Sequence, residues 1–202
     1  ITNCTFSGNS TIGSGGGMYN AGWPTITNCT FSGNTANLGG GMSNEGSPAI
    51  TNCAFSGNSA SQFGGGMYCD AGALTITNCT FSGNTANGGG GMYSESLLRI
   101  MNCTFTGNSA GFFGGGGMSN VGSGSLTIKN TIVWANTPNE IFVSAGSAAV
   151  TYSIVQGGFI GTGNTNGDPL FVDGNGADNV YGTPDDNMRL QAGSLAIDTG
   201  SN

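Results

Sequence analysis

Three carboxylates recur at one fixed place in this sequence and suggest polysaccharide chemistry. Glu45, Asp70 and Glu95 each follow, by three residues, the methionine of a repeated GGGM phrase. If the phrase stacks on its own copies, neighbouring carboxylates lie about 5 Å apart and alternate ones about 10 Å. Those separations bracket the geometries of retaining and inverting glycoside hydrolases. The stack is therefore a candidate site for binding or cleaving a polysaccharide.

Other features argue against catalysis. Histidine is absent, so there is no imidazole base and no Ser-His-Asp triad. The basic residues number three: Arg99, Lys129 and Arg189. Neighbouring copies of the repeat carry Ala21 and Val121 where the carboxylates stand. We therefore expect a protein that is not an enzyme, with a polysaccharide hydrolase or lyase, or a carbohydrate-binding protein, as the alternative.

A second cluster of oxygen ligands lies near the C-terminus, in DGNGADNVYGTPDD. Carboxylate and amide oxygens on a glycine-rich loop suit Ca²⁺. The spacing is similar to the start of an EF-hand loop but lacks its closing Glu, and an acidic turn with Asx caps is the alternative. The predicted Ca²⁺ ligands are Asp173, Asn175, Asp178, Asp185 and Asp186.

Five of the six cysteines share one place in the repeat. Zinc needs a tetrahedral set of ligands, which a straight file of single thiols does not provide. Thr131 and Ser153 take the same place in later copies, so the position selects a small side chain rather than a thiol. We expect inward, protonated thiols, with Cys69 as either a partly exposed thiol or a local substitution. The file comprises Cys4, Cys29, Cys53, Cys79 and Cys103.

The element that positions these residues is a repeat of the phrase ITNCTFSGN. Copies begin at Ile1, Ile26, Ile50, Ile76 and Ile100, with degenerate copies after them, and a period of about 25 residues is typical of solenoids. Apolar and polar residues alternate on both sides of the phrase's first asparagine, and their parity breaks there. That break predicts a corner, because asparagine tolerates the left-handed conformation.

The pattern predicts an all-β, single-stranded parallel β-helix with three short strands per coil. It places five regular and two degenerate coils in residues 1–167, and an irregular, acidic closing segment in residues 168–202. Each residue then stacks on its own copy in the next coil. The phrase's last asparagine forms an amide ladder along one edge: Asn9, Asn34, Asn58, Asn84 and Asn108.

Outward threonines and serines form a further array on the same strands. Two files about 6.6 Å apart, in ranks about 4.8 Å apart, resemble the threonine arrays of ice-binding β-solenoids. Ordinary strand propensity is the alternative explanation. The pairs are Thr5/Ser7, Thr30/Ser32, Ala54/Ser56, Thr80/Ser82 and Thr104/Thr106.

Asparagines of the repeat also fall in glycosylation sequons. Glycans on exported copies are one interpretation, and an accident of the corner residues is the other. The sequons are at Asn3, Asn9, Asn28, Asn78 and Asn102.

Composition narrows the partners. A net charge of −7 with three basic residues disfavours nucleic acid and anionic membrane surfaces. No apolar run is long enough to span a bilayer. The chain starts at Ile1 inside a repeat and shows no signal peptide, so we expect a processed or partial product of a longer, exported precursor.

The paired phrases FSGN and GGGM resemble the FxxN and GGx repeats of polymorphic outer-membrane proteins, and more broadly the secreted right-handed β-helix proteins of bacteria. That resemblance implies right-handed coiling, an extracellular or cell-surface location and an adhesive or structural role. Met follows the glycines here where Ala or another aliphatic residue is usual, and no autotransporter barrel is present. The stretch from DPLFVD to AIDTG is similar to the tail that closes many such proteins.

We therefore expect a non-enzymatic, extracellular structural or adhesive β-solenoid. The open β-edge of the first coil should be covered by further coils of a longer chain or by a second subunit stacking end to end into a fibre. Carbohydrate binding through the carboxylate stack and ice binding through the hydroxyl array are the alternatives.

Overall fold

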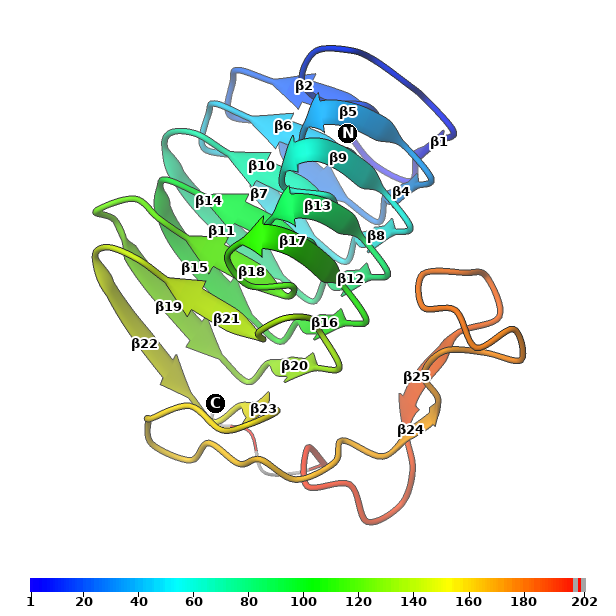
Figure 1. Ribbon diagram of the computed structural model, residues 1–202, viewed down its shortest axis with the longest axis vertical. Helices are drawn as coiled ribbons and strands as arrows, with labels where there is room; N and C mark the ends of the chain where they lie inside the picture. The colour runs from blue at the N-terminus through cyan, green and yellow to red at the C-terminus, as the bar shows by residue number, and fades with distance from the viewer. Residues whose placement is uncertain (198–199, 201–202) are drawn as a thin grey trace.

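The computed structural model describes residues 1–197 and 200 and has the all-β, parallel architecture that the repeat predicts. Successive coils stack in register, so that Phe6 pairs with Phe31 and Met42 with Met67 (Figure 1). The described residues contain no apolar helix of membrane-spanning length. Four parallel sheets run along the stack, and we name three of them by the residue that they turn inward.

The isoleucine sheet holds the ITN part of the phrase. Ile26, Ile50 and Ile76 are fully buried, and each strand but the last is followed by an asparagine corner, which Tyr152 replaces after β22. Asn28, Asn52 and Asn78 have φ of 53–54°, the left-handed conformation that the parity break predicts. The strands are β3 (Thr25–Thr27), β7 (Ala49–Thr51), β11 (Ala73–Thr77), β15 (Leu97–Met101), β19 (Ser125–Lys129) and β22 (Ser147–Thr151).

The phenylalanine sheet follows each asparagine corner. Its inward rings form a stacked column with centroids 4.5–4.8 Å apart and planes within 6° of parallel. The strands are β1 (Thr5–Ser7), β4 (Thr30–Ser32), β8 (Ala54–Ser56), β12 (Thr80–Ser82), β16 (Thr104–Thr106), β20 (Ile132–Trp134) and β23 (Ile154–Val155).

The methionine sheet follows the glycine run. A Cβ on Gly40 would collide with the backbone of the next coil, and one on Gly41 would press on the ring of Phe55. Glycine therefore lets consecutive coils approach at this corner. The strands are β2 (Met18–Asn20), β6 (Met42–Asn44), β10 (Met67–Cys69), β14 (Met92–Ser94), β18 (Met118–Asn120) and β21 (Ile141–Val143).

The middle coils carry a fourth strand, which corrects the prediction of three strands per coil. The residues after the FSGN phrase pair across coils before the glycines begin, and Ala36 and Ala60 turn inward. One small inward residue between asparagine and glycine gives too short an alternation to be read from sequence. This short sheet comprises β5 (Thr35–Leu38), β9 (Ser59–Phe63), β13 (Thr85–Gly88) and β17 (Ser109–Phe113).

A buried asparagine ladder runs through the interior. The side-chain oxygen of Asn84 accepts hydrogen bonds from both the backbone and the side-chain nitrogen of Asn58, at 3.0 and 2.9 Å. The side-chain nitrogen of Asn84 donates to Asn108 and to the carbonyl of Phe55. The same bonds recur from Asn9 to Asn136, one coil beyond the predicted members.

Glu140 closes this ladder. Asn136 is the last asparagine of the ladder. Its backbone and side-chain nitrogens donate to the two carboxylate oxygens of Glu140 instead of to the next asparagine. Burial raises the pKa of Glu140, and the Asn136 donors oppose that shift by favouring the charged form. A carboxylate suits the place because it offers two acceptors and no donor.

Four members of the cysteine file, from Cys29 to Cys103, are buried, whereas Cys4 of the first coil is exposed. The backbone N–H of Cys53 points at the sulfur of Cys79, 3.3 Å away, and the thiols donate to carbonyls such as that of Thr51. All six cysteines are free thiols. Contact with Cys79 and burial raise the pKa of Cys53, so its reactive thiolate is suppressed. Cys69 is fully buried, as a local substitution in the file of Asn20 and Asn44.

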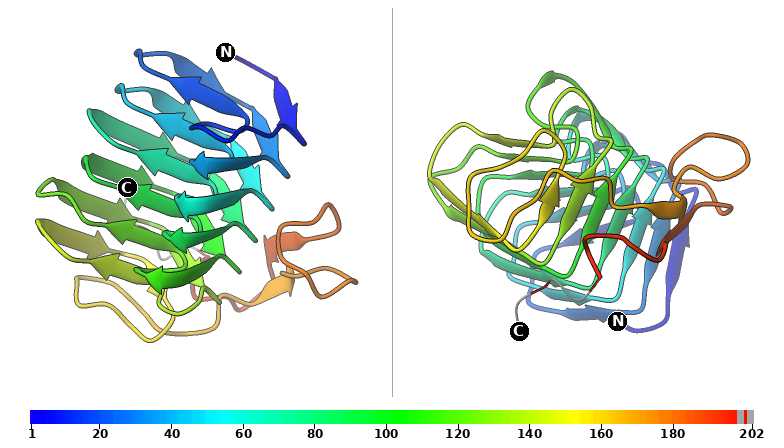
Figure 2. Two further views of the ribbon diagram at one scale, coloured as in Figure 1. Left: turned by 45° about the horizontal axis from the view of Figure 1, so that its top comes forward. Right: turned by 90° about the horizontal axis from the view of Figure 1, so that it is seen from below.

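The chain leaves the stack after β23 and turns back along its side. An antiparallel pair, β24 (Phe171–Asp173) and β25 (Asn187–Leu190), stands outside the outline of the coils (Figure 2). Part of the closing segment predicted over 168–202, namely residues 198–199 and 201–202, lies outside the described part of the chain. At the other end, Ile1 is 47% exposed whereas its copy Ile26 is buried. End-to-end association stays a prediction.

The ladder makes a stability prediction. Asn84→Ala should lower the free energy of unfolding by about 3–5 kcal/mol, because two buried donors of Asn58 lose their acceptor. Asn87→Ala is the control, since Asn87 is exposed and its side chain donates to the carbonyl of Ser61, and it should cost about 0.5 kcal/mol or less. Chemical denaturation followed by circular dichroism measures both. Equal losses would show that the ladder does not stabilise the stack.

Candidate ligand-binding face

The structure brings the three predicted carboxylates together at the corner that follows the methionine sheet. The backbone N–H of Asp70 bonds to the carbonyl of Asn44, and that of Glu95 to the carbonyl of Cys69. The ladder thus continues through the corner and places Glu45, Asp70 and Glu95 on consecutive coils. All three side chains are exposed.

Tyrosines stand beside these carboxylates, which the sequence reading missed. The outward, middle position of the methionine sheet holds Tyr19, Tyr68 and Tyr93, with Ser43, Ser119 and Phe142 in the other coils. Tyr68 and Tyr93 stack with centroids 5.7 Å apart. The sequence did carry a signal for them, because a tyrosine follows the methionine of GGGM in three of the five copies. We call these tyrosines and the three carboxylates the tyrosine–carboxylate face.

The two kinds of side chain interact directly. The hydroxyl of Tyr68 donates to Oε1 of Glu95 at 3.3 Å. Burial, and then the negative charges of Glu95 and Asp70, raise the pKa of Tyr68. A hydrogen bond with Glu45 raises that of Tyr19. The face therefore combines neutral phenols, aromatic rings and negative charge, and it offers acceptors to a ligand that has hydroxyl groups.

An aromatic cavity adjoins this face. It encloses about 450 Å³, and no residue lining it is charged. Its walls are Phe63, Tyr93, Phe112, Gly114, Val121, Pro138, Asn139, Phe142 and Ser144. The sequence reading missed it because Phe63 and Phe112 lie where the repeat departs from its own consensus, in SASQF and SAGFF. Those departures were the signal.

The outward hydroxyl array is interrupted by the C-terminal segment. Tyr181 and Gly182 lie across the corner glycines Gly83 and Gly107, where any Cβ would collide with them. Thr106 is fully buried, and among the described residues its hydroxyl has no hydrogen-bond partner. The flat array predicted over five coils is therefore not fully open to solvent. Because ice must contact the hydroxyls directly, the covered coils of the array form a poor template for ice.

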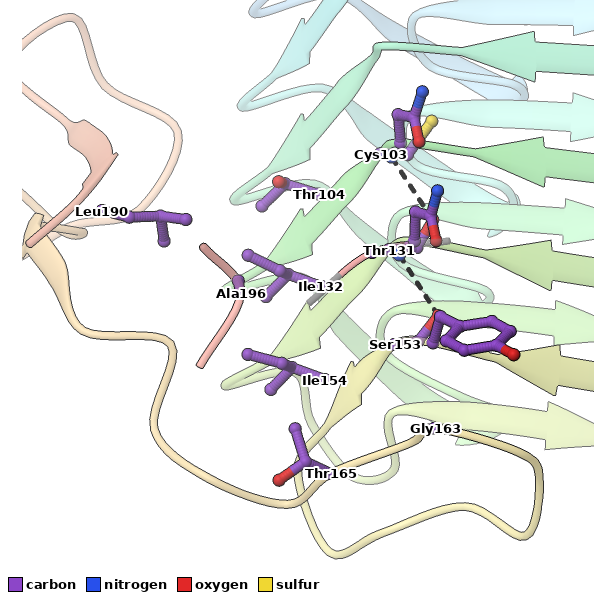
Figure 3. Close-up of a pocket in the computed structure, with 14 residues that line it drawn as sticks. Cys103, Thr104, Thr131, Ile132, Ser153, Ile154, Gly163, Thr165, Leu190 and Ala196 are labelled. Carbon is purple, nitrogen blue, oxygen red and sulfur yellow. Dashed lines mark hydrogen bonds between the residues drawn. The ribbon is translucent and has the colours of Figure 1, made fainter. Parts of the chain in front are cut away.

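The same segment covers the lower part of the phenylalanine sheet. A cavity of about 230 Å³ lies between Leu190 and Ala196 on one side and Thr104, Ile132 and Ile154 on the other (Figure 3). Isoleucine replaces the outward threonine in the last two coils, so the surface under the segment is apolar.

Of the predicted calcium ligands, the structure gathers three around Thr183. Its hydroxyl lies 2.7 Å from Asp185 and 3.4 Å from Asp178 and Asp186. Its hydrogen bond to Asp185 lowers the pKa of that exposed carboxyl. In the described part of the chain no three Asp, Glu or Cys side chains are arranged to hold a metal ion. Calcium binding by these residues and by Asp173 and Asn175 stays a prediction.

The sequon asparagines take two kinds of place. Those at the corners are exposed, and in a second ladder the side chains of Asn28 and Asn78 donate to Asn3 and Asn52. Asn9 belongs to the first coil and donates to Asn34 of the interior ladder. Glycosylation of any of them stays a prediction.

Comparison with known proteins supports the architecture. A family model described as a right handed beta helix region matches residues 15–183 and confirms the predicted fold and handedness. No curated protein and no solved structure matched the chain. The finer resemblance, to the repeats of polymorphic outer-membrane proteins and to a closing tail, stays a prediction.

The contact of the C-terminal segment can be tested with two matched glycines. Gly33 and Gly83 share one place in the repeat and φ near +60°, but a Cβ on Gly33 meets nothing within 4 Å. Both Gly33→Ala and Gly83→Ala should cost about 1 kcal/mol for the left-handed backbone. Gly83→Ala alone should displace Tyr181 and increase hydrogen exchange in residues 174–186. Equal exchange in the two variants would contradict the contact.

Calcium binding has a direct test. Calorimetry at millimolar Ca²⁺ should show a heat that Asp173→Ala lacks and that Asp70→Asn, a carboxylate change outside the segment, retains. The absence of a heat in the unmodified protein would remove the site.

Proposed function

The chain belongs to the right-handed β-helix family, and on that basis we propose that it is a non-enzymatic, extracellular adhesive protein that binds carbohydrate through the tyrosine–carboxylate face. The observation that carries the proposal is the hydrogen-bonded pairing of phenol rings with a file of carboxylates on one exposed side of the solenoid. The family includes polysaccharide-active enzymes, so carbohydrate is a ligand class that this architecture accommodates.

The chemistry of the face suits a sugar chain. A pyranose ring presents apolar C–H groups on its faces and hydroxyls around its rim. Aromatic rings bury the former at little entropic cost, because Tyr has few rotatable bonds. Carboxylates accept strong, charge-assisted hydrogen bonds from the latter. Tyr68 with Asp70 and Tyr93 with Glu95 stand on two consecutive coils, so the face offers similar contacts to successive parts of a polymer.

Two observations favour binding over catalysis. The basic residues Arg99, Lys129 and Arg189 belong to β15, β19 and β25, none of which is in the methionine sheet. The face therefore lacks a cation from its own sheet that would stabilise negative charge developing in a lyase reaction. Glu95 already accepts the Tyr68 hydroxyl, and all three carboxylates of the face are exposed. A hydrolase needs two carboxylates in contrasting environments, one protonated and one charged.

The location and the adhesive role rest on the repeats. Their likeness to secreted β-helix proteins supports an extracellular setting, and the low fraction of charged residues, 6%, supports a sparsely charged, extended scaffold. An array of weak sugar contacts along such a scaffold gains strength through multivalency.

Glycan binding tests the proposal. Against a panel of neutral and acidic polysaccharides, Tyr68→Ala and Glu95→Gln should each weaken binding about five- to tenfold, as expected when a central aromatic or charged contact is lost. Tyr152→Ala is the control, because Tyr152 is an exposed aromatic residue that follows β22 on another sheet.

Two outcomes would overturn the proposal. Equal binding by all variants would exclude the face, and release of shortened chains that Glu95→Gln abolishes would make the protein an enzyme.

A further inference from the structure

We propose that the aromatic cavity beside the tyrosine–carboxylate face binds a quaternary ammonium group. The inference goes beyond carbohydrate binding; the cavity shares Tyr93 with the tyrosine–carboxylate face, and its other lining residues are different. Four aromatic residues from four strands converge on the cavity: Phe63 of β9, Tyr93 of β14, Phe112 of β17 and Phe142 of β21. Faces of aromatic rings attract cations through their quadrupole, and several rings around one cation form the aromatic cage that recognises methylated ammonium groups.

The departures from the repeat build this cage. Phe63 pairs across coils with Gly88, which has no side chain, and the strand register shifts beside that pair. The Phe63 ring therefore extends over the gap and stacks on Tyr93, with centroids 4.3 Å apart. Bulges of this kind redirect side chains, and they are frequent beside binding sites.

The opposite wall has a similar origin. SAGFFGGGG is two residues longer than the matching TANGGGG of the preceding coil, and it carries Phe112, which is 94% exposed. Gly114 lies next to Ser119 and within reach of the Phe142 ring, which a Cβ there would approach to 3.5 Å. A Cβ on Gly114 would collide with Ser119, so glycine lets the chain pass this close to Ser119 at the edge of the cavity.

The charges around the cavity favour a cation. No Lys or Arg lines it, and the chain carries a net charge of −7. Burial raises the pKa of Tyr93, whose ring forms one wall, and the negative charge of nearby Glu95 raises it further. A carboxylate near an aromatic cage lowers the cost of moving a cation out of water.

The polar groups of the cavity select the kind of cation. A primary ammonium carries three N–H donors that require acceptors. The lining offers the polar side chains of Tyr93, Asn139 and Ser144, and is otherwise aromatic, aliphatic or glycine. A quaternary ammonium has no N–H donor, so it loses fewer hydrogen bonds to water on entering. A methylated ammonium of the choline class therefore fits better than a lysine side chain.

Matched ligands separate charge from shape. Choline and its neutral isostere 3,3-dimethylbutan-1-ol are titrated into the intact chain, with ethanolamine as the primary ammonium, and aromatic NMR resonances report the binding. Choline should bind at least about tenfold more tightly than the other two, the ratio expected for a partly desolvated cation–π contact.

Matched variants locate the site. Phe142→Leu and Phe112→Leu keep the wall apolar but remove the ring, and each should weaken choline binding about fivefold or more. Both residues are exposed, so folding should persist, which circular dichroism checks. Tyr152→Leu is the control and should bind choline as before.

The outcomes decide the proposal. Equal binding of the neutral isostere would make the cavity a plain apolar pocket, and tighter binding of ethanolamine would make it a lysine site. A lack of saturable choline binding, or unchanged binding in both leucine variants, would overturn it outright. Because Tyr68→Ala tests carbohydrate and spares the cavity lining, failure of one proposal is distinguishable from failure of the other.

Discussion

A buried amide must find partners for all its donors and acceptors, and this requirement sets the phase of the whole solenoid. Each ladder asparagine, such as Asn58, satisfies its amide only when the next copy lies directly below. A slip of one residue would leave several buried groups unpaired and turn the inward set outward. The phenylalanine column, the cysteine file and the outward rows all inherit their register from this constraint.

The repetitive part of the fold is predictable because the same local rule acts in every coil. Asparagine corners, inward isoleucines and stacked phenylalanines follow from alternation and its parity break. The fourth strand is hidden because a single alanine between polar and glycine residues carries little periodic signal. Glu140 is likewise invisible, since only the structure shows that Asn136 ends the ladder.

The candidate site was only half predictable for a related reason. The carboxylates share the period of the repeat, so their stacking can be read from spacing alone. The aromatic cavity arises from breaks in that period, at Phe63 and Phe112, whose consequences depend on which glycine lies opposite. The contact of Tyr181 with the corner glycines joins distant segments and has no local signal. The consensus positions of the repeat therefore determine the stacking of the coils, and the positions that depart from the consensus determine the shape of the surface.

The amide ladder also has a direction. Every rung donates from one coil to the next in chain order, and Glu140 ends the series as a pure acceptor. A duplicated coil inserted anywhere between Asn9 and Asn136 would accept from the rung before it and donate to the rung after it. The asparagine of the same coil placed after Glu140 would receive no hydrogen bond from the ladder, because the carboxylate of Glu140 has no donor. Duplication of a coil would therefore lengthen this protein, and deletion would shorten it, with the terminating coil at Glu140 unchanged and every amide still paired.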